Sequence, residues 1–230
     1  MFKTEMHCHC RPASACSHVK ASSMVEDYVN AGYTSMVLTD HLNDQTFSPE
    51  LEKDTWQKRV DYFVSGYNIL KETAEGKINV LFGSEIRLLN DPYTDYLVYG
   101  VTEEFLRSID DPRYLKRSPD LAALIHEHGL MIFQAHPFRE NMLIPDPAFL
   151  DGMEIGNLCY YKESNNDMAQ MWAERKGLIG ITGTDYHIRS ATPVGGIATD
   201  YPITDNETLL KTLRDGTFTP LWGDPSPKEK

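Results

Sequence analysis

The sequence predicts one α/β domain in which strands and helices alternate and the strands form a barrel of parallel strands. Short apolar segments alternate with longer amphipathic segments, as expected when helices cover buried strands. Metal-binding side chains follow the apolar segments at several places. The 230 residues, 41% of them hydrophobic, suffice for one substantial core. We therefore expect a single domain over residues 1–230.

Seven apolar segments have the length and composition of buried strands. They cover residues 2–6, 35–39, 78–82, 96–99, 130–133, 152–155 and 178–181. Three amphipathic segments are predicted to be helices, at residues 21–31, 49–75 and 118–128. Each ends at a glycine, namely Gly32, Gly76 and Gly129, as expected for a helix C-terminus. The tail at residues 222–230 is expected to be loosely ordered.

The charge balance restricts the partners of this chain. With 34 acidic and 22 basic residues, its formal net charge is −12, which argues against nonspecific binding to nucleic acid or anionic lipid. An anionic substrate would need a local positive centre, and a bound divalent cation supplies one.

The cysteines and the N-terminus indicate a soluble, cytoplasmic protein. Cys8, Cys10, Cys16 and Cys159 match neither a zinc knuckle nor a disulfide framework, so reduced thiols are the plainer interpretation. The first residues do not form a secretory signal, and no segment approaches the roughly 18 apolar residues of a membrane span.

The potential ligands lie where predicted strands end. His7 and His9 close the first strand, and both side chains would point to the same side of it. Such a pair alone is weak evidence, since two surface or hydrogen-bonded histidines have the same spacing. Later strand ends add a carboxylate or a histidine each, at Asp40-His41, Glu85, His136 and Asp185-Tyr186-His187. Because strand ends converge at the mouth of a barrel, one metal site is expected there.

In this order, the residues from Met6 to His187 resemble the polymerase-and-histidinol-phosphatase (PHP) family of metal-dependent phosphoesterases. The most specific part is the opening block, with His7-Cys8-His9, a third histidine after Ser17, and a strand ending in Thr39-Asp40-His41. The resemblance implies a distorted (β/α)7 TIM-like barrel. It also implies a phosphoester hydrolase that binds two or three divalent metal ions. These ions would be zinc, manganese or iron, with magnesium as a further option.

The resemblance assigns each ligand to an ion. His7, His9, Glu85 and Asp185 would hold the first, and Glu85 would bridge to a second that His136 also holds. The third would be held by His18, His41 and His187. The chain departs from the family at residues 96–100, where a further histidine is usual and none is present. Asp95 could take its place, which leaves the number of ions open.

Catalytic roles can be suggested for residues beside these ligands. Two nearby cations, one of them held by Asp185, would activate a water and stabilise the phosphoryl oxygens. Arg11, Arg139 and Arg189 are candidates to contact the substrate, although the ordinary interpretation of each is a solvated or ion-paired loop arginine. His187, Asp40 or a metal-bound water could protonate the leaving group.

Other polar residues have simpler interpretations. His126 and His128 are expected to interact with the C-terminus of a helix or with solvent. Glu154 is expected either to hydrogen-bond a ligand or to be a structural residue at the end of a strand. Cys8 and Cys10 should point into the barrel wall. Tyr186 stands between two expected ligands. Four other tyrosines could line a cleft, but tyrosines more often pack with the hydroxyl at a wet edge; they are Tyr93, Tyr96, Tyr160 and Tyr161.

The expected reaction is hydrolysis of a small phosphomonoester, as in a histidinol phosphatase, with a sugar or nucleotide phosphate equally open. The alternatives are a phosphodiesterase or exonuclease, against which the net charge argues, and a noncatalytic metal-binding regulatory module. Fold alone does not choose between them.

Overall fold

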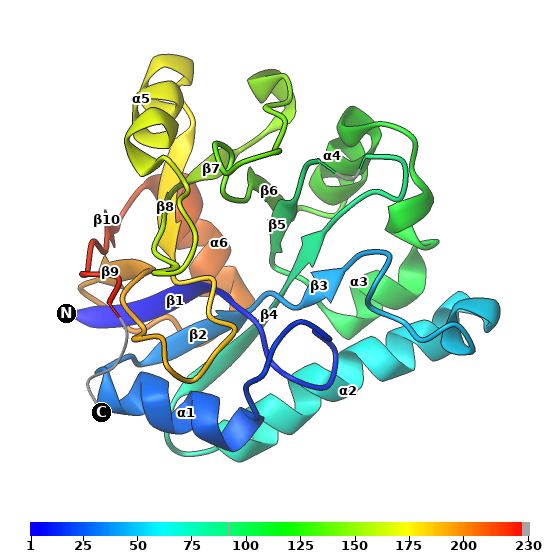
Figure 1. Cartoon of the computed structure of the whole chain (residues 1–230), viewed down its shortest axis with the longest axis horizontal. Coiled ribbons are helices and arrows are strands. Elements are labelled where there is room, and N and C mark those ends of the chain that lie inside the picture. The colour runs from blue at the N-terminus through cyan, green and yellow to red at the C-terminus, as the bar shows by residue number, and fades with distance from the viewer. Residues whose placement is uncertain (92, 227–230) are drawn as a thin grey trace.

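The computed structural model describes residues 1–91 and 93–226, and its strands form one sheet that curves into a nearly closed barrel (Figure 1). Seven strands make the barrel: β1 (Phe2–Cys8), β2 (Ser35–Leu38), β4 (Asn79–Ile86), β5 (Tyr96–Tyr99), β6 (Met131–Gln134), β7 (Gly152–Asn157) and β8 (Ile179–Gly183). A parallel bridge between Cys8 and Tyr186 joins the end of β1 to the segment after β8. The predicted TIM-like barrel of the α/β class is confirmed.

Three short strands extend this barrel. β3 (His41–Leu42) pairs in parallel with β4, whereas β9 (Ile197–Thr199) and β10 (Thr219–Pro220) continue the sheet beside β1 in antiparallel orientation. The sequence analysis did not predict these strands, which are only two or three residues long.

The expectation that all barrel strands are parallel is wrong at β5. This strand is antiparallel to both β4 and β6, with Ile86 opposite Tyr96 and Tyr96 opposite Gln134. Only residues 87–95 connect β4 to β5. A parallel crossover needs a dozen or more residues, so this connection can only turn the chain back. As a result, the amino end of β5 lies at the barrel mouth, beside the carboxyl ends of its neighbours.

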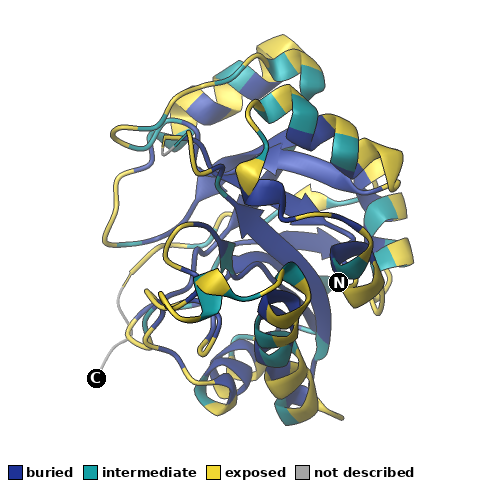
Figure 2. Ribbon diagram, turned by 90° about the vertical axis from the view of Figure 1, so that its right-hand side faces the viewer, coloured by how far each residue is buried: buried dark blue, intermediate teal, exposed yellow. Residues whose placement is uncertain are grey.

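Helices cover the outside of the barrel, with their exposed faces turned to solvent and the strands buried within (Figure 2). The predicted helices correspond to α1 (Ala21–Asn30), α2 (Trp56–Ala74) and α4 (Ser118–Glu127). The glycines after them have φ angles of +79°, +71° and +71°, the left-handed conformation that the prediction required. Three further helices were not predicted: α3 (Glu103–Ser108), α5 (Asn166–Lys176) and α6 (Asn206–Asp215).

The predicted start of the second helix at residue 49 is wrong. Residues 51–53 form a separate 3-10 turn, η1 (Leu51–Lys53), and α2 begins only after Thr55. Two more such turns are η2 (Pro112–Tyr114) and η3 (Pro147–Phe149). Within residues 1–91 and 93–226, the longest helices are too short or too polar to cross a membrane.

A buried carboxylate fixes β1 against the segment after β8. Glu5 accepts hydrogen bonds from the backbone N–H groups of His7, at 3.0 Å, and Thr184, at 2.9 Å. It also accepts bonds from the hydroxyls of Tyr28 and Thr184. Burial raises the pKa of Glu5, whereas these hydrogen bonds, first those of Thr184, lower it. The network fixes β1 against the segment after β8, and four of the eight expected ligands lie on or just after these two elements.

The tail falls partly outside the described residues, since residues 227–230 are not described. Residues 222–226 form no helix or strand. Nevertheless, Gly223 donates to the Val194 carbonyl at 3.3 Å, and the Trp222 ring packs over Gly156.

Candidate metal centre

Seven of the eight expected ligands lie together at the barrel mouth. Their ligand atoms fall into three overlapping groups in which all atoms lie within 4.8 Å of one another: His9, His41 and His187; His7, His9 and Asp185; His7, Glu85 and His136. They come from β1, β3, β4 and the segments directly after β1, β6 and β8. The convergence that the strand-end pattern predicted is therefore present in the structure.

Glu85 stands at the centre of these groups. Its Oε2 lies 3.6 Å from His7 Nε2, 3.4 Å from His9 Nε2 and 2.7 Å from His41 Nδ1. Its Oε1 lies 3.1 Å from His136 Nε2. The sequence analysis placed Glu85 after the end of its strand. In the structure Glu85 lies within β4. One carboxylate thus faces four imidazoles, with an oxygen directed to each side, as a bridging ligand requires.

The ring of His7 is oriented by Glu154. His7 Nδ1 lies 2.9 Å from Glu154 Oε1, so that Nδ1–H donates a hydrogen bond to the carboxylate and Nε2 points into the site. The other oxygen of Glu154 accepts bonds from the backbone N–H of His136, at 2.8 Å, and from Asn157 Nδ2, at 3.0 Å. Glu154 therefore makes the ligand-orienting contacts that were one of its two interpretations.

The ring of His9 is oriented by Ser14. The Ser14 hydroxyl lies 3.3 Å from His9 Nδ1, donates to Asp40 Oδ1 at 2.7 Å, and accepts from the backbone N–H of His41 at 3.0 Å. Asp40 also accepts from the Cys10 N–H, and burial raises the pKa of Asp40 to about 7. Asp40 is thus connected through Ser14 to His9 and His41, and it is not among the described residues that line the pocket.

The donor set fits divalent cations. In the described part of the chain, His7 Nε2 and His9 Nε2 are buried and have no hydrogen-bond partner, a costly arrangement unless a cation accepts their lone pairs. Burial, together with neighbouring His187 and His41, lowers the pKa of His9. His9 is thereby kept neutral, the form in which imidazole binds a metal.

Two ligands have a strained backbone. His136 has a φ of 27° and Asp185 a φ of 50°, in or near the left-handed region that residues other than glycine rarely adopt. Such conformations persist where the surroundings enforce them, often at functional sites. The bond from the His136 N–H to Glu154 is one such constraint.

Asp185 connects the ligands to an arginine. Its Oδ1 lies 3.5 Å from His7 Nε2 and 3.4 Å from His9 Nε2, while its Oδ2 is 2.8 Å from Arg139 Nη2. Burial raises the pKa of Asp185, but His7 and Arg139 outweigh this and hold that pKa well below its usual range. Asn157 accepts a second bond from Arg139, at 2.7 Å. Asp185 is thus an ionised carboxylate at neutral pH.

His187 and His41 face each other at one edge of the site, with 3.5 Å between their Nε2 atoms. His187 Nδ1 lies 2.9 Å from the carbonyl oxygen of Asp185. Burial lowers the pKa of His187, but the Asp185 carboxylate raises it further, to about 9. Without a cation at its Nε2, His187 therefore carries a proton.

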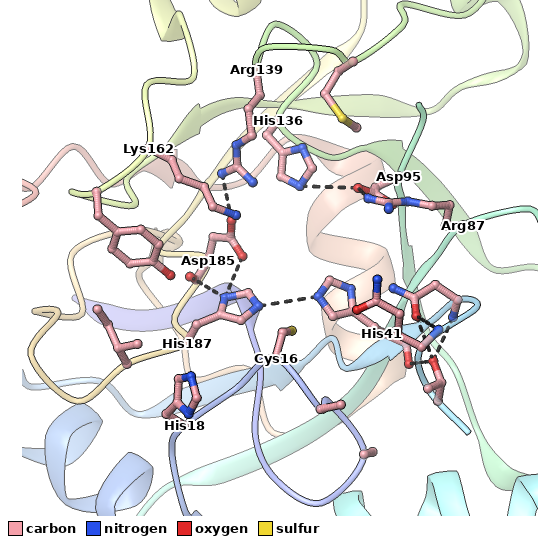
Figure 3. Close-up of a pocket in the computed structure, with 18 residues that line it drawn as sticks. Cys16, His18, His41, Arg87, Asp95, His136, Arg139, Lys162, Asp185 and His187 are labelled. Atoms are coloured by element: carbon pink, nitrogen blue, oxygen red, sulfur yellow. Dashed lines mark hydrogen bonds and ion pairs between the residues drawn. The ribbon is translucent and has the colours of Figure 1, made fainter. Parts of the chain in front are cut away.

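A pocket of about 410 Å³ opens above these ligands (Figure 3). Three cationic side chains line it, with Arg139 and Lys162 on one side and Arg87 on the other. Thr46 and Asn43 contribute polar groups from the segment after β3. The pocket could accommodate a small anion-bearing molecule over the candidate metal centre.

Several expected residues lie elsewhere. His18 is exposed and lines the pocket, but within residues 1–91 and 93–226 it belongs to none of the three ligand groups. Arg11 donates to the Ser17 carbonyl at 2.7 Å. Arg189 extends toward α1, where it pairs with Glu26 at 2.5 Å. Neither arginine is part of the pocket lining formed by the described residues.

The residues that were set aside have structural contacts. His126 pairs with Asp151 at 3.0 Å, and His128 approaches the Leu124 carbonyl at the end of α4. Cys8 and Cys10 are buried in the barrel wall, as predicted, and all four cysteines are free thiols. Of the tyrosines, Tyr161 lines the pocket, whereas Tyr186 is buried against Asp27.

Sequence reasoning missed four residues near the site: Ser14, Cys16, Arg87 and Lys162. Arg87 could have been predicted from the sequence, because it stands two positions after Glu85 and residues two apart on a strand point to the same side. Cys16 lines the pocket. Burial raises the pKa of Cys16, but hydrogen bonds with His187 and His41 lower it to about 6. Ser14 and Lys162 lie in loops without any local pattern.

Comparison with known proteins gives matches in structure alone. No protein-family profile matches the sequence, and no curated protein matches it significantly. Among solved structures, a Bacteroides vulgatus two-domain protein containing a predicted PHP-like metal-dependent phosphoesterase aligns with a TM-score of 0.68 and 16% identity. The alignment covers 96% of this chain and 66% of that protein.

Two other solved structures are similar over nearly the whole chain. PsfC from Pseudomonas syringae aligns with a TM-score of 0.65 and 14% identity, over 96% of this chain and 91% of PsfC. The lesion-specific endonuclease EndoQ from Pyrococcus furiosus aligns with a TM-score of 0.62 and 14% identity, over 95% of this chain and 57% of EndoQ. At these identities the likeness concerns the fold. This chain has the fold of the PHP-like metal-dependent phosphoesterases.

Proposed function

We propose that this protein is a metal-dependent hydrolase that cleaves phosphate esters of small molecules. The observation that supports this most strongly is the position of Glu85, whose two oxygens face His7, His9 and His41 on one side and His136 on the other. This arrangement suits a bridging carboxylate between cations.

Divalent ions bound there would supply Lewis-acid stabilisation of phosphoryl oxygens and would lower the pKa of a water molecule. His7, His9, Glu85, His136 and Asp185 would hold two of them. His41 and His187, whose Nε2 atoms face each other, would hold a third, so that two or three ions are proposed.

The side chains around the pocket have their own tasks in this reaction. Arg139, fixed by Asp185 and Asn157, would bind and orient the phosphoryl group through its remaining N–H groups. His187, whose pKa of about 9 keeps a proton on its ring, can donate that proton to the leaving oxygen where no cation occupies its Nε2.

A small substrate is favoured over nucleic acid for two reasons. The pocket volume of about 410 Å³ falls within the range of roughly 300–1,000 Å³ that is usual for small-molecule sites. In addition, the net charge of −12 would repel a polynucleotide backbone. The structural neighbour EndoQ is an endonuclease, which makes cleavage of nucleic acid the alternative to be tested beside phosphomonoesters.

The test combines metal analysis with an activity screen. The purified protein would be stripped with chelator, reloaded with manganese, zinc or iron, and assayed on phosphorylated metabolites, on bis-p-nitrophenyl phosphate and on single-stranded and duplex DNA. We expect release of phosphate from a monoester, abolished in His9→Ala and Asp185→Ala, which should also lose bound metal. Bound metal without hydrolysis of any ester would support a noncatalytic module, and unchanged metal content in both variants would refute the site.

A further inference from the structure

Three side chains meet at the corner of the site around His136. His136 Nε2 lies 3.1 Å from Glu85 Oε1 and 3.8 Å from Asp95 Oδ2. His136 and Glu85 also share a ligand group with His7, whose buried Nε2 has no hydrogen-bond partner among the described residues. Asp95 itself is 2% exposed. A second carboxylate therefore faces the same imidazole nitrogen as Glu85 does, and Figure 3 shows Asp95 and His136 turned toward each other.

The topology explains why Asp95 is there. Asp95 immediately precedes β5, and β5 is antiparallel to β4 and β6. In an antiparallel strand the amino end, not the carboxyl end, lies at the barrel mouth. A residue just before β5 therefore occupies the position that a residue just after a parallel strand would occupy.

Arg87 holds the Asp95 carboxylate in one orientation. Arg87 Nε donates to Asp95 Oδ1 at 2.6 Å, and Arg87 Nη2 donates to Asp95 Oδ2 at 2.5 Å. This bidentate contact fixes the plane of the carboxylate. It uses two of about four acceptor positions on the two oxygens, so that one position on Oδ2 is left to face His136.

We propose that Asp95 is a cation ligand together with Glu85 and His136, and that Arg87 is the residue that positions it. This inference depends on the metal-binding part of the proposed function. Two carboxylates and one imidazole suit manganese or magnesium better than an all-nitrogen site does, whereas the pair of His41 and His187 suits zinc. The two ends of the centre would thus differ in metal preference.

A structural ion pair between Arg87 and Asp95 is the competing interpretation, and manganese titration separates the two. Chelator-treated protein would be titrated with Mn²⁺, with the free ion measured by electron paramagnetic resonance. In Asp95→Asn we expect one Mn²⁺ fewer per chain, or at least about tenfold weaker binding of that ion. Asp95→His should restore the ion with zinc in place of manganese.

Two further variants complete the test. Arg87→Met should weaken manganese binding by about 10- to 100-fold, as expected for loss of a group that orients a ligand. Glu104→Gln, which removes an exposed carboxylate from α3, is the control and should bind like the wild type. Circular dichroism would confirm that all variants are folded.

Unchanged manganese stoichiometry and affinity in Asp95→Asn would overturn the assignment of Asp95, and wild-type affinity in Arg87→Met would overturn the positioning role. No phosphate ester is present in these titrations. Loss of one Mn²⁺ in Asp95→Asn, in a protein that hydrolyses no ester, would support this inference while refuting the hydrolase.

Discussion

His7 and Glu154, which are 147 positions apart in the sequence, meet across the barrel with 2.9 Å between His7 Nδ1 and Glu154 Oε1. The same carboxylate accepts the backbone N–H of His136. One side chain therefore orients two expected ligands.

Replacing Glu154 with alanine should weaken metal binding by about 10- to 100-fold, because both ligands lose the acceptor that orients them. Competition with a fluorescent chelator would measure the affinity. Glu127→Ala, which removes an exposed carboxylate from α4, is the control and should bind metal normally. Wild-type affinity in Glu154→Ala would contradict the orienting role.

Replacing Ser14 with alanine should destabilise the metal-free protein by about 1–3 kcal/mol, because the His41 N–H and Asp40 lose a buried hydrogen-bond partner. Urea unfolding would measure the loss. Ser190→Ala, at an exposed position, should leave the unfolding midpoint within error. Equal midpoints for both variants would show that the Ser14 hydroxyl contributes nothing.

Arg139 and Arg189 were equivalent candidates in the sequence, and the structure predicts different outcomes for them. Arg139→Ala should lower kcat/KM for a phosphate ester by about 10- to 100-fold, equivalent to about 1.5–3 kcal/mol for a lost charged hydrogen bond. Arg189→Ala should stay within about twofold of the wild type, since Arg189 pairs with Glu26 outside the pocket. A larger loss in Arg189→Ala would contradict this placement.

Asp205 should stabilise the protein in a pH-dependent way. It caps α6 by accepting from the Thr208 N–H at 2.8 Å, and this bond lowers the pKa of Asp205. Asp205→Ala should cost about 0.5–2 kcal/mol at pH 7. Because the folded-state pKa is the lower one, the charge contribution is fully present above the ordinary value of 3.8. It is lost as the pH falls through the folded-state pKa.

Asparagine caps a helix without titrating in this range. The stability difference between the wild type and Asp205→Asn should therefore shrink or reverse in acid, as measured by thermal unfolding from pH 7 to pH 3. A difference that does not change with pH would contradict the ionised cap.

Local patterns in the sequence determined the seven barrel strands and most of the expected ligands. His7 and His9 could be predicted because alternate residues of a strand share a side, and Asp185 and His187 because they follow a predicted strand. Gly32, Gly76 and Gly129 could be predicted as helix ends for an equally local reason.

The tertiary structure alone decided the partners of those ligands. The antiparallel course of β5, which brings Asp95 to the mouth, follows from how neighbouring strands pair rather than from the pattern within β5. The contacts of Glu154 with His7, and of Ser14 with Asp40, join residues that are distant in sequence. Such contacts arise only when the barrel closes, because closure brings separate strand ends to one place.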